Sequence, residues 1–147
     1  MKQKSVNCVC EAIENIDELQ NAVKEDCPTG CDTKLLSPNH NLGDTVPFVL
    51  FTSKSKPFLA FGNIGGLDNG PCFNTIFFKV EKVNGCCATL SLLIAFNEQK
   101  EILDFAEKET VCELFRLEKT HYCIEVDLNH FCAIKCLNPR LINRNLG

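Results

Sequence analysis

Cysteine is the residue type that most restricts what this chain can fold into, because eleven of its 147 residues are cysteine. Such a density is typical of secreted domains stabilised by disulfides and of metal proteins. The count is odd, so at least one cysteine cannot pair within the chain. That cysteine must be a free thiol, a metal ligand or one half of an intermolecular bond.

Length and composition predict one domain with an adequate apolar core. Hydrophobic residues make up 45% and charged residues 23%, close to the globular average. The apolar core can therefore stabilise the fold without disulfides.

The N-terminal residues contain no apolar run of the kind that a secretory signal requires, which predicts synthesis in a cytoplasm with reduced thiols. The apolar runs are too short for a transmembrane helix. The net charge of −4 argues against a nucleic-acid or anionic-membrane partner.

Residues 8–26 have the period of an amphipathic helix. The apolar positions recur at steps of three and four residues, and they are Val9, Ala12, Ile13, Ile16, Leu19, Ala22 and Val23. Asn7 is the predicted N-cap, and Pro28 and Gly30 end the helix. The polar side is acidic. The residues that follow, 27–45, are rich in turn formers and are predicted to form a loop.

From residue 46 onward the sequence is typical of β-structure. Segments rich in Val, Ile, Thr and Phe are separated by turn signals, and they are 46–52, 57–63, 74–83, 86–96, 110–117, 120–128 and 130–137. The dipeptide Asn84-Gly85 predicts a hairpin turn. Residues 97–109 are charged and are either a short helix or a long loop.

These patterns predict a mainly-β fold with one N-terminal amphipathic helix. The expected architecture is a single-domain β-sandwich or a Greek-key-like barrel of about seven strands. Within it, residues 1–30 form an N-terminal arm and the acidic helix, and residues 31–147 form the cysteine-rich β-domain.

Strand alternation assigns a face to several cysteines. Cys86 shares the apolar face of its strand, whereas Cys87 and Cys123 fall on polar faces and are expected to be exposed. Cys132 and Cys136 share one face roughly 13 Å apart along the strand, which is beyond usual disulfide reach. Each of these two therefore needs a separate partner.

The remaining cysteines are sorted by their place in the predicted elements. Those at the helix start and in the loop are the most accessible, and they are Cys8, Cys10, Cys27 and Cys31. Free cysteine is among the most buried residue types. Buried thiols are expected at Cys72, Cys86 and Cys112.

Two chemical alternatives compete with a structural role. A zinc site could use Cys27 and Cys31 with His40, or with the Cys132 and Cys136 pair, as soft ligands. The spacing is looser than in zinc ribbons, and a cysteine- and histidine-based zinc-binding interaction module stays open as the alternative. A cysteine enzyme would need a thiolate beside His121 or His130. No local nucleophile signature surrounds any cysteine, so we expect no enzymatic activity, no cofactor and no bound metal.

Several long segments resemble a known family. The most particular are EDCPTGC (25–31), FGNIGGLDNGPCFNTIFFKVEKV (61–83) and the pair YCIEVDL (122–128) and FCAIKCL (131–137). With them the chain resembles, over nearly its whole length, the spore coat protein family that includes CotY, CotZ and the exosporium protein ExsY, and its CotZ-type crust members most of all.

The resemblance implies a structural role rather than a catalytic one. Family members are self-assembling building blocks of the outer spore coat, crust or exosporium. They form hexagonal two-dimensional layers crosslinked by disulfides, and they are made in the mother cell. The implied partners are further copies of the chain, in a hexameric ring extending to sheets, and other coat or crust proteins. The candidates for intermolecular disulfides are then Cys8, Cys10, Cys27, Cys31, Cys87, Cys123, Cys132 and Cys136.

Overall fold

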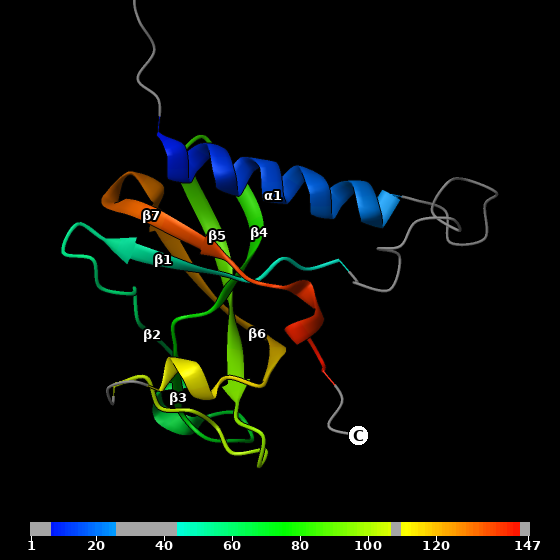
Figure 1. The fold of residues 1–147 in the computed structure, drawn as a ribbon, viewed down its shortest axis with the longest axis vertical. Helices are drawn as coiled ribbons and strands as arrows, with labels where there is room; N and C mark the ends of the chain where they lie inside the picture. The colour runs from blue at the N-terminus through cyan, green and yellow to red at the C-terminus, as the bar shows by residue number, and fades with distance from the viewer. Residues whose placement is uncertain (1–6, 26–43, 107–109, 145–147) are drawn as a thin grey trace, which may run out of the picture.

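The computed structural model describes residues 7–25, 44–106 and 110–144 (Figure 1). Within these ranges the chain has one α-helix, α1 (Cys8–Glu25), at its N-terminal end. Seven strands follow, and they are β1 (Phe48–Thr52), β2 (Ala60–Gly62), β3 (Phe73–Thr75), β4 (Phe78–Asn84), β5 (Cys87–Phe96), β6 (Arg116–Asp127) and β7 (Phe131–Cys136). The predicted mainly-β class with one N-terminal helix is confirmed. The division at residue 30 falls outside the described ranges and stays a prediction.

Helix α1 begins at the predicted cap and packs through its predicted apolar face. The Asn7 side-chain oxygen accepts a hydrogen bond of 2.9 Å from the backbone N–H of Cys10, which satisfies one of the free donors at the helix start. Val9, Ile13 and Ile16 are buried against the sheet. Leu19 is 58% exposed, so the buried stripe is narrower than the sequence pattern.

A buried polar side chain fixes the second half of α1. Gln20 is 3% exposed; its amide donates to the carbonyl of Val80 over 2.9 Å and its oxygen accepts from the N–H of Val46 over 3.0 Å. The replacement Gln20→Ala leaves both backbone groups without their partner. We therefore expect a loss of about 2 kcal/mol in the free energy of unfolding, measured by urea denaturation. Exposed Asn21 is the matched control, and an equal effect of Asn21→Ala would contradict this role.

The strands form a five-stranded antiparallel sheet and a separate two-stranded ribbon. The sheet order is β6-β5-β4-β1-β7, and β2 pairs with β3 in the ribbon. One apolar cluster lies under α1, with Phe78, Leu90 and Leu92 among its members. A second cluster includes Phe77 and Leu93. Successive strand residues point to opposite faces of the sheet. The adjacent side chains of Leu92 and Leu93 therefore pack into different clusters.

The five-stranded sheet divides into two parts that cross. A single pair, Phe48 opposite Phe78, joins β1 to β4, whereas β1 pairs with β7 along its whole length. Figure 1 shows β1 and β7 running across the direction of β4 and β5. Among the described strands the sheet stays open, with β6 and β7 at its edges, so of the two expected architectures the closed barrel is not formed.

Two strand boundaries differ from the sequence prediction. The segment predicted as 74–83 is split between β3 and β4, because the Thr75 hydroxyl accepts from the N–H of Phe77 over 3.1 Å and donates to the carbonyl of Leu93 over 2.7 Å, which bends the chain. Conversely, 120–128 and the end of 110–117 join into the single strand β6. Charged residues interrupt the apolar pattern there without ending the strand, since they lie at a solvated sheet edge.

The predicted hairpin is present one residue later than expected. Asn84 still pairs with Cys87, so the two-residue turn consists of Gly85 and Cys86. Gly85 has a φ of 62°, a backbone conformation that favours glycine. Residues 97–106 form a turn and an extended segment rather than a helix. No helix in the described part of the chain is long and apolar enough to cross a membrane.

Candidate functional site: the cysteines and two surface hollows

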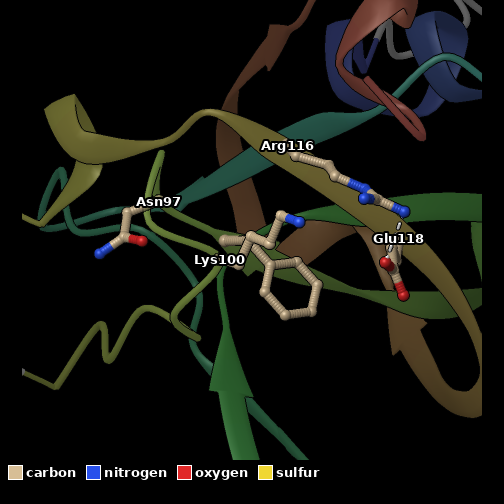
Figure 2. A pocket seen from close by; sticks show the side chains of 5 residues that line it. Asn97, Lys100, Arg116 and Glu118 are labelled. Atoms are coloured by element: carbon tan, nitrogen blue, oxygen red, sulfur yellow. Dashed lines mark ion pairs between the residues drawn. The ribbon is translucent and has the colours of Figure 1, made fainter. Parts of the chain in front are cut away.

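A small surface pocket lies where β5 ends and β6 begins (Figure 2). It has a volume of about 120 Å³, and it is lined by Phe96, Asn97, Lys100, Arg116 and Glu118. Arg116 is ion-paired to Glu118 over 2.7 Å. The lining contains neither cysteine nor histidine, so this pocket does not supply the thiolate and base that a cysteine enzyme needs. No sequence motif signalled it, because its residues come from separate elements.

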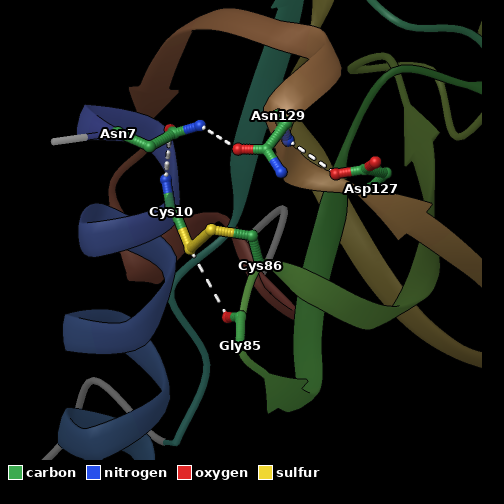
Figure 3. The surroundings of a disulfide bond; sticks show 6 residues. All are labelled: Asn7, Cys10, Gly85, Cys86, Asp127 and Asn129. Atoms are coloured by element: carbon green, nitrogen blue, oxygen red, sulfur yellow. Dashed lines mark hydrogen bonds between the residues drawn. A yellow bond between two sulfur atoms is a disulfide. The ribbon is translucent and has the colours of Figure 1, made fainter. Parts of the chain in front are cut away.

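A disulfide links α1 to the turn between β4 and β5 (Figure 3). Cys10 is bonded to Cys86, with 5.4 Å between their Cα atoms. The same corner contains a hydrogen bond of 2.7 Å from the Asn7 side-chain amide to the side-chain oxygen of Asn129. The helix start is therefore tied both to the β4–β5 turn and to the segment that precedes β7.

This disulfide overturns two of the sequence expectations. Cys10 was expected to bond to another subunit, and Cys86 was expected to be a buried free thiol. The shift of the hairpin turn by one residue explains both errors, because it places Cys86 in the turn beneath α1. Cys10 is on the buried stripe of the helix, 6% exposed, so its nearest partner is inside the chain.

Seven further cysteines in the described ranges are free and exposed, and they are Cys8, Cys72, Cys87, Cys112, Cys123, Cys132 and Cys136. The exposure expected for Cys87 and Cys123 is confirmed. The burial expected for Cys72 and Cys112 is wrong, because Cys72 precedes β3 in a loop and Cys112 lies in the 3₁₀ turn Val111–Glu113. Cys27, Cys31 and His40 lie outside the described residues.

The exposed thiols are spread over several parts of the surface. Cys87 and Cys123 are on the same outward face of β5 and β6, since Cys123 pairs with Ser91 and odd-numbered residues of β5 share that face. A register shift between Phe51 and Thr52 interrupts the ladder opposite Cys132. The regular alternation of side chains along a strand, which predicted that Cys132 and Cys136 share a face, is therefore broken at Cys132.

The surroundings of two thiols disfavour their thiolate forms. Burial raises the pKa of the Cys123 thiol above its ordinary value, and the carboxylates of Glu81 and Glu125 raise it further. Burial also raises the pKa of Cys136. Because the thiolate is the reactive species, we expect both thiols to react more slowly at neutral pH than an ordinary cysteine, and faster as the pH rises.

Removing the carboxylate of Glu125 tests this electrostatic control. We expect Glu125→Gln to lower the pKa of Cys123 and to speed its alkylation by iodoacetamide at neutral pH roughly twofold or more, in proportion to the thiolate fraction. Mass spectrometry of the Cys123 peptide measures the rate. The matched control is Glu98→Gln, a charge in the turn after β5, and equal acceleration by both variants would refute a local effect.

The histidines in the described ranges contact carboxylates rather than thiols. His121 is 3.2 Å from Asp68, and His130 is 3.8 Å from Asp127. The hydrogen bonds from His121 and Tyr122 hold the pKa of Asp68 below its ordinary value. Within the described residues there is no group of three or more His, Cys, Asp or Glu side chains that could hold a metal ion.

The fold and its thiols define a class: a small cysteine-rich β-protein with its own core and, in the part of the chain that the structure describes, one internal disulfide and several exposed thiols. The family model described as spore coat protein Z matches residues 1–139. The chain is also 74% identical over 144 residues to spore coat protein Z of Bacillus subtilis strain 168, covering 98% of this chain and 97% of that protein. No solved structure is significantly similar.

The chain therefore belongs to the spore coat protein Z family. Membership supports a structural role in the spore coat, at the spore surface, and it agrees with the expectation that the protein is not an enzyme. The resemblance inferred from the sequence motifs is confirmed.

Proposed function

We propose that this chain is a self-assembling subunit of an ordered, hexagonal two-dimensional layer in the outer spore coat, crust or exosporium, crosslinked by disulfides between subunits. The observation that carries the proposal is the set of exposed free thiols on separate elements of the described structure. The family membership supports the location and the structural role.

The subunit does not need these thiols for its own stability. Its core is formed by two apolar clusters, and α1 is already tied to the sheet by the Cys10–Cys86 bond. A subunit that tiles a plane must contact neighbours in more than one direction. Thiols on α1, on the outer face of β5 and β6 and on β7 meet that requirement.

The timing of oxidation follows from the compartment. Synthesis in the reducing mother-cell cytoplasm keeps exposed thiols free, and loss of that cell exposes the layer to oxidants. Disulfides formed between neighbours that are already packed make dissociation depend on a reductant. Thiols left at the layer surface are available to other coat or crust proteins.

Electron microscopy of the purified protein tests the assembly. We expect ordered sheets from the unaltered chain, both with and without reductant. We also expect sheets from a variant in which the seven exposed cysteines and also Cys27 and Cys31 are serine, but these should disperse in detergent. Only dispersed particles from the unaltered chain under every condition would refute self-assembly.

A further inference from the structure

The pocket at the end of β5 has an unused capacity to bind an anionic group. The Nε atom of Arg116 is buried and has no hydrogen-bond partner within the described residues, although its Nη2 atom is paired with Glu118. Lys100 lines the same pocket and has no ion pair in the described part of the chain. The Arg116 side chain as a whole is 31% exposed, so its guanidinium and Lys100 together present positive charge to an anionic group at this pocket.

The pocket is rigid enough to act as a receptor. The Asn97 side-chain oxygen accepts from the backbone N–H groups of Gln99 and Glu101, each over 2.9 Å. The Asn97 side-chain amide donates to the Glu101 carboxylate over 2.9 Å, which engages that negative charge. The turn that carries Lys100 is thus fixed by its own hydrogen bonds, and Figure 2 shows Lys100 and Arg116 among the side chains that line the pocket.

A complementary hollow lies on α1. It has a volume of about 260 Å³ and is lined by Glu14, Asn15, Asp17, Glu18 and Val83. Glu14 and Glu18 are exposed and one helical turn apart, so their carboxylates project from one side of the helix. Lys82, next to Val83 in β4, is an exposed cation near this hollow and reduces its negative potential without cancelling three carboxylates.

The two hollows lie at opposite ends of β5. Val83 pairs with Ala88 at the start of β5, and Phe96 pairs with Arg116 at its other end. By strand rise Ala88 and Phe96 are roughly 27 Å apart. One molecule therefore cannot bring its own acidic hollow to its own basic pocket.

We propose that the acidic side of α1 in a second copy of this chain docks on the pocket, with the Glu14 and Glu18 carboxylates against Lys100 and the Arg116 guanidinium. This contact joins unlike ends, so it is heterologous, and repeating it produces rows or closed rings. It deepens the proposed function and rests on it. It identifies one set of non-covalent contacts that positions neighbours before their thiols oxidise.

Charge reversal on each side tests the contact under reducing conditions, where disulfides play no part. In Lys100→Glu an acidic helix meets an acidic pocket, and in Glu14→Lys/Glu18→Lys a basic helix meets a basic pocket. Sedimentation velocity of each variant alone should show self-association weakened about tenfold or more, as expected for like charges at an interface. Raising the salt concentration should also weaken the self-association of the unaltered chain, because salt screens the attraction between the charges.

Mixing the two variants supplies the decisive comparison. Each acidic helix then meets an intact pocket and each basic helix meets a reversed one, so association should recover in the mixture to within about threefold of the unaltered chain. The control Lys54→Glu, in the exposed turn after β1, should associate like the unaltered chain.

The failures of the two proposals are distinguishable. A mixture no better than its components, or an equal loss in Lys54→Glu, would overturn the docking proposal while sheets of the unaltered chain kept the proposed function. An unaltered chain that stays monomeric with and without reductant would overturn both.

Discussion

Removing the internal disulfide is expected to lower the free energy of unfolding by about 4 kcal/mol. The bond closes a loop with a sequence separation of 76 residues, and a crosslink over such a distance strongly restricts the unfolded chain. The variant is Cys10→Ser/Cys86→Ser, which leaves no unpaired thiol behind. Urea unfolding without reductant measures the difference.

The control distinguishes loss of the crosslink from loss of a cysteine. Cys112→Ser removes an exposed free thiol and should change stability by less than about 0.5 kcal/mol. Adding reductant to the unaltered chain should reproduce the midpoint of the double variant. If the double variant unfolds at the same urea concentration as the unaltered chain, the internal bond does not stabilise the subunit.

Phe78→Ala is expected to cost about 3–5 kcal/mol. Phe78 is fully buried, and its ring centroid lies 5.6 Å from that of Phe58 and 6.4 Å from that of Phe48. It is also the residue of β4 that pairs with β1. Its loss therefore opens a cavity at the point where the two parts of the sheet join.

An exposed phenylalanine provides the control for this substitution. Phe61, on the outward side of β2, is 54% exposed, and Phe61→Ala should change the free energy of unfolding by less than about 1 kcal/mol. Thermal or urea unfolding of both variants is sufficient. An equal decrease in the free energy of unfolding in both variants would contradict the role of Phe78 as a core residue that joins the two parts of the sheet.

The sequence predicts the elements of this fold better than their arrangement. Hydrophobic periodicity locates α1 and the β-segments because each element must bury one face. The break between β3 and β4 depends on the Thr75 hydroxyl bonding to Leu93, a tertiary contact that no local pattern contains. The crossing of β1 and β7 over β4 likewise follows from one pairing between distant strands.

The cysteines show the same limit. Alternation predicts the exposure of Cys87 and Cys123, because both lie in regular strands. It fails for Cys86 because the hairpin turn is displaced by one residue, and the resulting bond to Cys10 joins elements far apart in sequence. Connectivity of this kind cannot be read from spacing.

A boiled gel of purified, oxidised assemblies, run with and without reductant, tests the central claim most directly. The account predicts dimers and larger species without reductant and a single band at the 16.4 kDa monomer with it. A variant in which the seven exposed cysteines and also Cys27 and Cys31 are serine should give only the monomer in both lanes. A monomer band alone in both lanes for the unaltered chain would contradict disulfide crosslinking between subunits.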